Sequence, residues 1–315
     1  MSESKKRRWV EFDSPWSCQP GKVRLIQTDS RVGSEELSKR AWRNELERPY
    51  IFDTLFERRL QFTNNATQSA MLLADPDALI AQYTRKMMAF LLFNPNPKHI
   101  VMIGLGGGSL PKFCYRNLPR SRITVVEIDA DVIALRDEFC IPKDDERFRI
   151  VHDDGARYVE RLDEPMDALL IDAFDAQGIA RSLAKPEFYA RAARHLTEDG
   201  TLVMNFWGPC ERYVDNLVHA RQAFGDSLLL VPVSGDANVL LFASRRPLPN
   251  SVTAELETVA TRLKMRLLLD FPHYLRRICQ GHTLSDPRVS MDEQVAAAFC
   301  LQSPRLQPDL QIEDD

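Results

Sequence analysis

The sequence predicts an α/β fold with a doubly wound parallel sheet and a small N-terminal β domain. Three observations support this prediction. An apolar run over residues 100–103 leads into a glycine-rich turn, a helical segment and a second apolar run over 123–126 that ends in an acid. Strand-length and helix-length segments then alternate to about residue 245, and before residue 73 there are only short strand-like runs. Such alternation is typical of parallel sheets with helices on both faces.

The first part of the chain predicts a small sheet, because short runs of strand-forming residues alternate with turn signals such as Asn64-Asn65. The expected strands are 23–27, 50–52, 60–63 and 69–73. Asp75-Pro76-Asp77 predicts the start of a helix that runs to about residue 93. The run Asn94-Pro95-Asn96-Pro97 then ends this helix and marks a domain boundary.

The remaining elements follow from the same patterns. Strands are expected at 100–103, 123–126, 148–151, 168–171 and 201–206, with a closing pair at 228–233 and 238–243 that predicts an antiparallel edge. Helices are expected at 131–139, 155–162, 186–196, 213–224, 253–264 and 271–279, and Glu198-Asp199-Gly200 predicts a turn. The predicted organisation is a flexible tail over 1–20, a β-rich domain with a linker helix over 21–95, a Rossmann-like domain over 96–248, and C-terminal helices and a tail over 249–315.

Composition narrows the functional class. The net charge of -4 and the pI near 5.9 argue against a nucleic-acid binder that works through a basic surface. No apolar run approaches the roughly 18 residues that a membrane span needs, and the N-terminus lacks the apolar core of a signal peptide. The six cysteines form no CxxC pair, so neither a metal site nor a disulfide framework is expected. We therefore expect a cytoplasmic protein.

The glycine-rich turn predicts the class of ligand. Glycine stands at every second position, Gly104, Gly106 and Gly108. The sixth position is Ser109, which does not fit the dinucleotide pattern, and the Gly-Lys-Ser/Thr ending of a P-loop is absent. The spacing resembles the first motif of the class I S-adenosylmethionine-dependent transferases. The alternative is a tight strand-to-helix turn that binds nothing.

Acids lie at or just after the ends of three of the predicted strands, and two of them, Glu127 and Asp172, end their strands directly. The third is Asp154, which precedes Gly155. Ligands of open parallel sheets bind beyond the carboxyl ends of the strands, so these acids are expected to share a site. Each could instead be a helix N-cap, which Asp favours. The acid at the end of the second strand is placed to accept hydrogen bonds from ribose hydroxyls.

Asp172-Ala173-Phe174-Asp175 places two carboxylates three residues apart in a loop at this edge. Such a pair can hold a cationic amine and remove its proton. An amine must be neutral before it attacks the carbon next to a sulfonium. The alternative for Asp175 is a solvated loop acid. Phe206-Trp207 lies at the end of the fifth strand. These aromatic side chains are expected either to stack on a ligand or to pack in the core.

Together these motifs resemble the spermidine synthases, or polyamine aminopropyltransferases, over roughly residues 47–243. The resemblance implies a class I methyltransferase-type Rossmann-like sheet. It also implies that Glu127 binds ribose, that Asp154 contacts adenine, that Asp172 is the base and that Asp175 holds the amine. It further places Gln68 and Tyr83 in the active site. The family often forms dimers, so a homodimer is an expectation.

Two positions depart from the family pattern. The family loop reads GGGDGG and its aspartate binds the amine of the aminopropyl arm, but here that position is Gly107. The family tyrosine is followed closely by a glutamate, but here Tyr83 is followed by Thr84 and Arg85. A site that loses an anion and gains an arginine is expected to favour a co-substrate with a carboxylate. This favours S-adenosylmethionine over its decarboxylated form.

The sequence therefore predicts a transferase that moves an alkyl group from an S-adenosylmethionine-type sulfonium to an amine or polyamine. The co-substrate is S-adenosylmethionine or decarboxylated S-adenosylmethionine, and the group transferred is left open between aminopropyl and methyl. No metal is expected. One alternative is a non-catalytic nucleoside-binding protein with a regulatory or assembly role. Another is a nicotinamide oxidoreductase, against which Ser109 argues.

Overall fold

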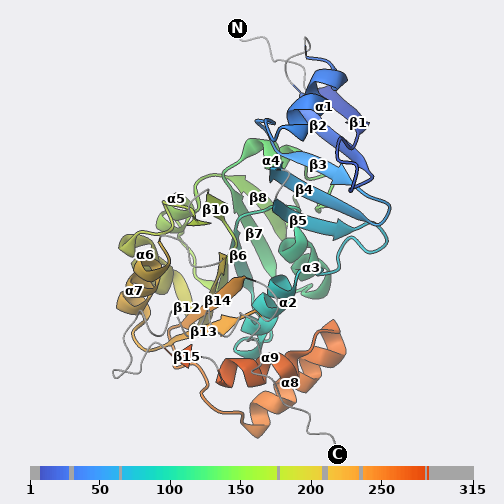
Figure 1. Ribbon diagram of the computed structural model, residues 1–315. Helices are drawn as coiled ribbons and strands as arrows, with labels where there is room; N and C mark the ends of the chain where they lie inside the picture. Colours follow the sequence, from blue (N-terminus) through green and yellow to red (C-terminus); the bar gives the residue numbers. More distant parts are fainter. Residues whose placement is uncertain are drawn as a thin grey trace, which may run out of the picture.

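The computed structural model describes residues 8–27, 32–63, 66–175, 178–207, 212–233, 237–280 and 282–283. Figure 1 shows a small N-terminal sheet beside a larger sheet that has helices on both of its faces. The predicted tails over 1–7 and 303–315 and the turn Asn64-Asn65 lie outside the described residues. In the part of the chain that is described, no helix combines the length and the apolar character that crossing a membrane requires.

The N-terminal sheet is an antiparallel meander whose five strands follow chain order. They are β1 (Arg8–Asp13), β2 (Lys22–Gln27), β3 (Tyr50–Asp53), β4 (Glu57–Thr63) and β5 (Ala66–Leu72). Helix α1 (Ser34–Trp42), which was not predicted, packs Leu37 against buried residues of β2 and β3. The prediction of a small N-terminal β domain is confirmed.

The first strand shows that the predicted tail over 1–20 is wrong for residues 8–13. All six residues of β1 pair with β2. Val10 and Phe12 pack against the buried cluster of the N-terminal sheet, and their neighbours Trp9, Glu11 and Asp13 are exposed. The alternation of apolar and charged residues is typical of a half-buried strand. The basic residues Lys5 to Arg8 are typical of a solvated tail, and they adjoin this short strand pattern in the sequence.

The larger sheet has eight strands in the order β15-β13-β14-β12-β9-β6-β7-β8. Strands β8 (Phe148–His152), β7 (Arg122–Glu127), β6 (His99–Ile103), β9 (Met166–Ile171) and β12 (Leu196–Trp207) are parallel. Strand β14 (Asn238–Ser244) runs antiparallel between β12 and β13 (Leu228–Pro232), and β15 (His282–Thr283) pairs with β13. The doubly wound parallel arrangement is confirmed. The predicted antiparallel edge is also present, because β14 and β13 pair antiparallel at this end of the sheet, and β15, which was not predicted, adds a further antiparallel strand outside β13.

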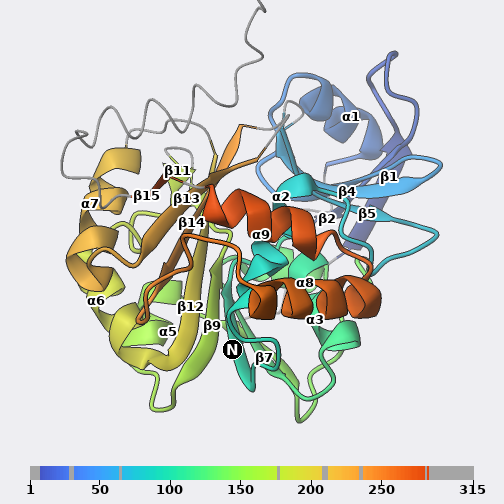
Figure 2. The same ribbon diagram turned by 90° about the horizontal axis from the view of Figure 1, so that it is seen from below.

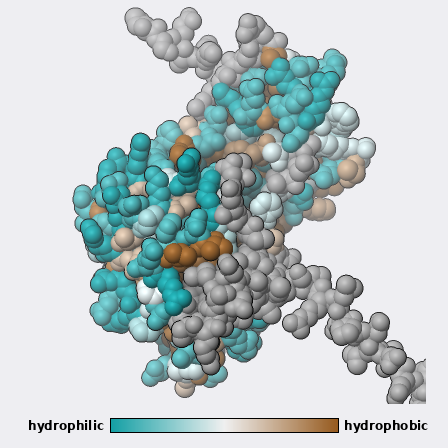
Figure 3. Space-filling model, turned by 60° about the vertical axis from the view of Figure 1, so that its left-hand side comes forward, coloured by the Kyte–Doolittle hydropathy of each residue, from teal (hydrophilic) through white to brown (hydrophobic). Residues whose placement is uncertain are grey.

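Side chains alternate between the two faces of this sheet and build two cores. Along β6, Ile100 and Met102 pack with α3 (Ser109–Asn117), α8 (Ala254–Leu267) and α9 (Phe271–Cys279). Val101 and Ile103 pack with α5 (Gly155–Glu160), α6 (Pro186–His195) and α7 (Tyr213–Phe224). Figure 2 shows α8 and α9 together over the segment that contains α2 (Gln82–Met87) and the 3-10 helix η1 (Met88–Leu92). The surface of one face, in Figure 3, is mainly hydrophilic, as expected when the apolar side chains pack inward.

Three predicted boundaries were wrong. The helix expected from Asp75 starts at Gln82, because the Asp75 carbonyl accepts from the Ala78 N–H in one turn that does not continue. The helix expected over 131–139 is α4 (Ala130–Ala134), followed by turns. The turn expected at 198–200 belongs to β12, whose pairing with β9 shifts register between Leu196 and Thr201.

A buried lysine connects α3 to the segment that follows α4. Lys112 is 1% exposed, and its ammonium donates to the Phe139 carbonyl oxygen at 2.8 Å. Burial lowers the pKa of Lys112 to about 8, which is below its ordinary value of 10.5. Between these two pH values the unfolded chain holds a proton that the folded protein has lost. The free energy of unfolding therefore rises with pH in this window.

We expect Lys112→Met to remove this rise. The free energy of unfolding of the wild type relative to the variant should increase by on the order of 3 kcal/mol between pH 8 and pH 10.5, which is the free-energy equivalent of the lowered pKa. Urea denaturation at several pH values measures this difference. Cys114, whose buried thiol has a pKa raised to about 12, acts in the opposite direction but equally in both proteins. Parallel stability curves would contradict the prediction.

Candidate active site

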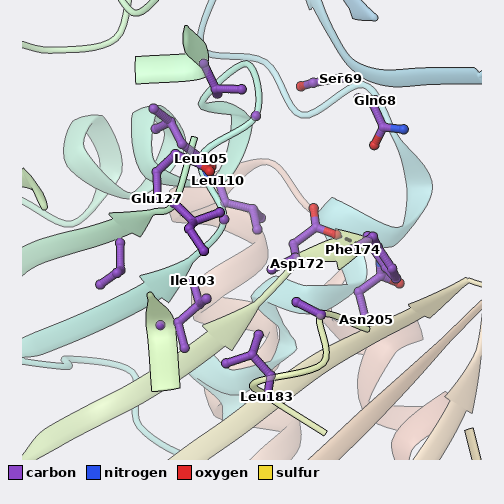
Figure 4. Close-up of a pocket in the computed structure, with 18 of the residues that line it drawn as sticks. Gln68, Ser69, Ile103, Leu105, Leu110, Glu127, Asp172, Phe174, Leu183 and Asn205 are labelled. Carbon is purple, nitrogen blue, oxygen red and sulfur yellow. Dashed lines mark hydrogen bonds between the residues drawn. The ribbon is translucent and has the colours of Figure 1, made fainter. Parts of the chain in front are cut away.

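A cavity of about 910 Å³ opens at the carboxyl edge of the parallel strands. It lies where the chain order of the sheet reverses, between β6 and β9, which is where ligands of open α/β sheets bind. The N-terminal sheet also contributes, because Thr67, Gln68 and Ser69 of β5 line the cavity. Figure 4 shows Gln68 and Ser69 on one side of this cavity and Asp172 with Asn205 on another.

The glycine loop forms one wall of the cavity. Gly104 has a φ of +94°, and a Cβ there would lie 2.2 Å from the Asp172 carbonyl oxygen. Only glycine allows this contact and this backbone conformation. Gly104 and Gly106 line the cavity. Gly108 lies at the start of α3, where a Cβ would lie 2.5 Å from Ile141, so this glycine permits close packing behind the loop.

Glu127 connects the end of β7 to the glycine loop. Its two carboxylate oxygens accept from the Leu105 and Asp129 backbone N–H groups, both at 2.8 Å. The side chain is 8% exposed and lines the cavity. Burial raises the pKa of Glu127, and the two backbone hydrogen bonds act against that rise. The carboxylate is therefore held at the cavity wall and oriented from both sides.

Asp154 is both a helix N-cap and a residue of the cavity wall, which were the two alternatives predicted for it. It is the N-cap of α5, where its Oδ1 accepts from the Ala156 N–H at 2.9 Å and the Arg157 N–H at 3.0 Å, and it also lines the cavity. Gly155 lines the cavity too, and a Cβ there would lie 2.4 Å from the Cγ2 of Ile103. Its role in packing is therefore to let α5 start directly against β6.

Asp172 lies at the end of β9, in contact with two elements that converge on it. The Tyr83 hydroxyl of α2 donates to its Oδ2 at 3.0 Å, and the Asn205 amide of β12 donates to its Oδ1 at 2.9 Å. Burial raises the pKa of Asp172, whereas both hydrogen bonds lower it. Two residues that the sequence analysis proposed separately, Tyr83 and Asp172, thus lie in direct contact.

Asp175 lies further out, on the short strand β10 (Phe174–Asp175), which pairs with β11 (Gly178–Ile179). It lines the cavity, and its Oδ2 accepts from Arg212 at 2.9 Å and from the Arg181 N–H at 3.2 Å. The partner Arg212 also donates to the Ile179 carbonyl oxygen at 2.6 Å. This ion pair was not predicted, because Arg212 precedes α7 and lies far along the chain from Asp175.

Three further residues of the cavity were missed or left open. Asn205 and Asn238 line it from β12 and β14, and a single buried Asn in an apolar strand was the available signal. Trp207 also lines the cavity and is 61% exposed. Its neighbour Phe206 is fully buried and packs edge-to-face on Tyr213. Of this pair, Phe206 therefore belongs to the core and Trp207 to the cavity wall.

The inference from Arg85 is wrong. Its Nε donates to the Leu79 carbonyl oxygen at 2.6 Å. Its positive charge opposes the rise that burial causes in the pKa of Tyr274 of α9. Arg85 does not line the cavity, and neither does Gly107. A Cβ at Gly107 would lie 2.8 Å from the Ser69 hydroxyl oxygen and 3.0 Å from the Phe139 ring. The expected cation for a co-substrate carboxylate therefore lies outside the site.

The charge of the cavity has one sign. The acidic residues that line it are Glu127, Asp153, Asp154, Asp172 and Asp175, and among the described residues that line it there is no Lys, Arg or His. A wall of this kind suits a cationic ligand.

A model of the spermine/spermidine synthase domain matches residues 80–216. The polyamine aminopropyltransferase of Chromobacterium violaceum is 35% identical over 234 residues, which cover 72% of this chain and 90% of that protein. This chain belongs to the polyamine aminopropyltransferase family. A second relative in this family, from Neisseria meningitidis serogroup A, is 33% identical over 232 residues, which cover 73% of this chain and 87% of that protein. The family predicted from the glycine loop and the acids is confirmed.

Solved structures support the fold of this aminopropyltransferase-family chain. A probable spermidine synthase from Corynebacterium glutamicum aligns with a TM-score of 0.57 and 22% identity, covering 69% of this chain and 84% of that one. A spermidine synthase from Thermotoga maritima aligns with a TM-score of 0.51 and 16% identity, covering 95% of this chain and 94% of that one. Both alignments support the class I methyltransferase-type fold, and the second, which covers 95% of this chain, extends over the N-terminal sheet as well.

We expect Gly107→Asp to destabilise the protein, because the new side chain overlaps Ser69 and Phe139. The free energy of unfolding should fall by about 1–3 kcal/mol, which is typical of overpacking. Urea denaturation measures the change. Gly33→Asp is the matched control, because no atom lies within 4 Å of a Cβ at Gly33 and Asp is favoured at this N-cap position. Equal stability of Gly107→Asp and the wild type would contradict the packing described here.

Proposed function

We propose that this chain transfers an aminopropyl group from decarboxylated S-adenosylmethionine to an amine or polyamine acceptor. The observation that carries the proposal is the charge of the cavity, which is lined by carboxylates and by no described basic side chain. A sulfonium donor with an ammonium arm and a cationic acceptor both suit this wall. The carboxylate of intact S-adenosylmethionine would enter without a cation to pair with, at a desolvation cost.

The nucleoside end of the proposed site is the glycine loop together with the first two acids. Glu127 accepts hydrogen bonds from the ribose hydroxyls, and Asp154 contacts the adenine. Gly104 and Gly106 present bare backbone to the nucleoside, while Gly108 and Gly155 keep the adjoining helices close to the sheet. This assignment is supported by the positions of Glu127 and Asp154 at the ends of neighbouring parallel strands.

The acceptor end is Asp172 with Asp175, Tyr83 and Gln68 around it. The amine nitrogen attacks the aminopropyl carbon, the carbon–sulfur bond breaks, and a neutral thioether leaves. Asp172 accepts the proton of the amine, and the raised pKa of this carboxyl makes it a better base than an ordinary aspartate. Asp175, Tyr83 and Gln68 orient the acceptor, so that much of the acceleration comes from alignment.

Methyl transfer loses its supporting observation, because the arginine that would have favoured it lies outside the cavity. A non-catalytic binding role is kept as an outcome of the experiments below. A homodimer and a cytoplasmic location stay predictions.

Calorimetric titration with both co-substrates tests the donor. We expect decarboxylated S-adenosylmethionine to bind at least about tenfold more tightly than S-adenosylmethionine, which corresponds to roughly 1.4 kcal/mol. Arg85→Gln should leave this ratio unchanged, since Arg85 does not line the cavity. Equal affinities, or tighter binding of the carboxylated compound, would overturn the proposed donor.

The variant Asp172→Asn tests the base. We expect aminopropyl transfer to a polyamine to fall by about 10²–10⁴-fold, while the affinity for decarboxylated S-adenosylmethionine changes little. Product formation is followed by mass spectrometry, with the exposed Asp163→Asn as a charge-matched control. If the wild type binds the donor and transfers nothing to any amine, the non-catalytic alternative replaces the proposal.

A further inference from the structure

The reversed strand β14 brings its first residue to the active edge of the sheet. Because β14 runs antiparallel to β12, its N-terminus lies where the parallel strands end. Asn238 is that first residue and pairs directly with Trp207, the last residue of β12. Met204 of β12 lies opposite Ile171 of β9, so Asn205 is level with Asp172. Three neighbouring strands thus bring polar residues to this edge of the sheet, with Asn205 level with Asp172 and Asn238 two residue positions further out along β12.

Hydrogen bonds connect these residues across the sheet. The Asn238 Nδ2 donates to the Asn205 Oδ1 at 2.8 Å, and the Asn205 Nδ2 donates to the Asp172 Oδ1 at 2.9 Å. Tyr83 donates to the other carboxylate oxygen at 3.0 Å. Asn205 and Asn238 are 1% and 5% exposed, so water competes little for these bonds. We refer to Tyr83, Asp172, Asn205 and Asn238 as the Asp172 network.

The direction of these bonds fixes the Asn205 amide. Its oxygen faces a donor on Asn238, so its NH₂ group faces Asp172. A flipped amide would oppose NH₂ to NH₂ on one side and oxygen to carboxylate on the other. In a buried site both mismatches are costly. Asn238 therefore determines whether Asp172 faces a donor, which favours its ionised form, or an acceptor, which favours its protonated form.

Other titratable groups around Asp172 do not supply this control. Tyr83 of α2 donates to it directly, and β6 with the glycine that follows it faces Asp172 with backbone groups, the Ile103 carbonyl oxygen and Gly104. Around the rest of the cavity stand Glu127, Asp153, Asp154 and Asp175, which are all acids. Arg212 pairs with Asp175 rather than with Asp172. With no described basic side chain lining the cavity, the ionised form of Asp172 depends on its two donors.

We propose that Asn238 is a positioning residue that keeps Asp172 ionised by holding the Asn205 amide with its NH₂ group toward the carboxylate. The proposal rests on the proposed function, in which Asp172 accepts the proton of the acceptor amine. Asn238 itself touches no reacting atom in this scheme. Its effect is therefore on the pH at which Asp172 becomes a base, and it acts through Asn205.

The pH dependence of kcat/KM in Asn238 variants tests this role. Asn238→Leu removes the donor to Asn205. Asn238→Asp keeps the size but offers only acceptors when ionised, so the Asn205 amide should turn its oxygen to Asp172. We expect the acidic limb of the profile to move up by about one pH unit in both variants. This is the change in the pKa of a buried carboxyl group that corresponds to the loss of one hydrogen bond to its ionised form. An unshifted limb with uniformly lower kcat/KM would mean a structural role only, and would overturn the proposal.

Thr201→Val is the matched control on β12. Thr201 is 1% exposed, and its hydroxyl has no hydrogen-bond partner within the described residues, so this variant should leave the limb in place. Thermal melting identifies any variant that fails to fold, and Asn238→Asp remains if Asn238→Leu is lost. A control variant that shifts the limb as far as the Asn238 variants would also overturn the proposal.

Infrared titration separates this inference from the proposed function. The carbonyl band of a protonated carboxyl group, assigned to Asp172 by its loss in Asp172→Asn, reports the protonation of Asp172 without turnover. We expect the band to persist to higher pH in Asn238→Leu and Asn238→Asp than in the wild type. An unshifted band overturns the role of Asn238 even if the enzyme is active. A shifted band with an inactive wild type would overturn only the proposed function.

Discussion

Backbone contact between the loop after β6 and the loop after β9 positions the groups at the active edge. A Cβ at Gly104 would lie 2.2 Å from the Asp172 carbonyl oxygen, and the Asp172 N–H donates to the Ile103 carbonyl oxygen at 3.0 Å. The two strand ends therefore touch where the order of the sheet reverses. This contact places Asp172 beside the glycine loop, and with it the network that extends to β12 and β14.

Carboxylates can gather around one cavity because the protein itself stabilises each of them. Glu127 accepts two backbone N–H bonds, Asp154 caps α5, and Asp172 accepts from Tyr83 and Asn205. Charge-assisted hydrogen bonds of this kind offset part of the desolvation and the mutual repulsion. The repulsion that remains raises the affinity of the cavity for cations, which is the property that the proposed function uses.

The N-terminal sheet also supports the glycine loop from behind. Arg58 of β4 pairs with Asp53 at 2.7 Å and donates to the Glu138 carbonyl oxygen at 2.6 Å, and Arg24 of β2 pairs with the Glu138 carboxylate at 2.8 Å. Residues 138–141 in turn pack against the loop, because Phe139 abuts Gly107 and Ile141 abuts Gly108. The small sheet thus contributes both lining residues and a fixed support.

The sequence by itself determined the α/β class, the glycine loop, the family and the acids at the strand ends, because each of these is a local pattern of apolar period, glycine and a terminal acid. It did not determine β1, the late start of α2 or the addition of β15 outside β13, since these depend on contacts with segments far along the chain. Only the tertiary structure turned Arg85 away from the cavity and paired Arg212 with Asp175. Likewise, only the tertiary structure brought Asn205 and Asn238 together at the cavity. The side-chain direction of a charged or amide residue is decided by whichever packed neighbour offers it a hydrogen bond, and spacing along one chain does not encode that neighbour.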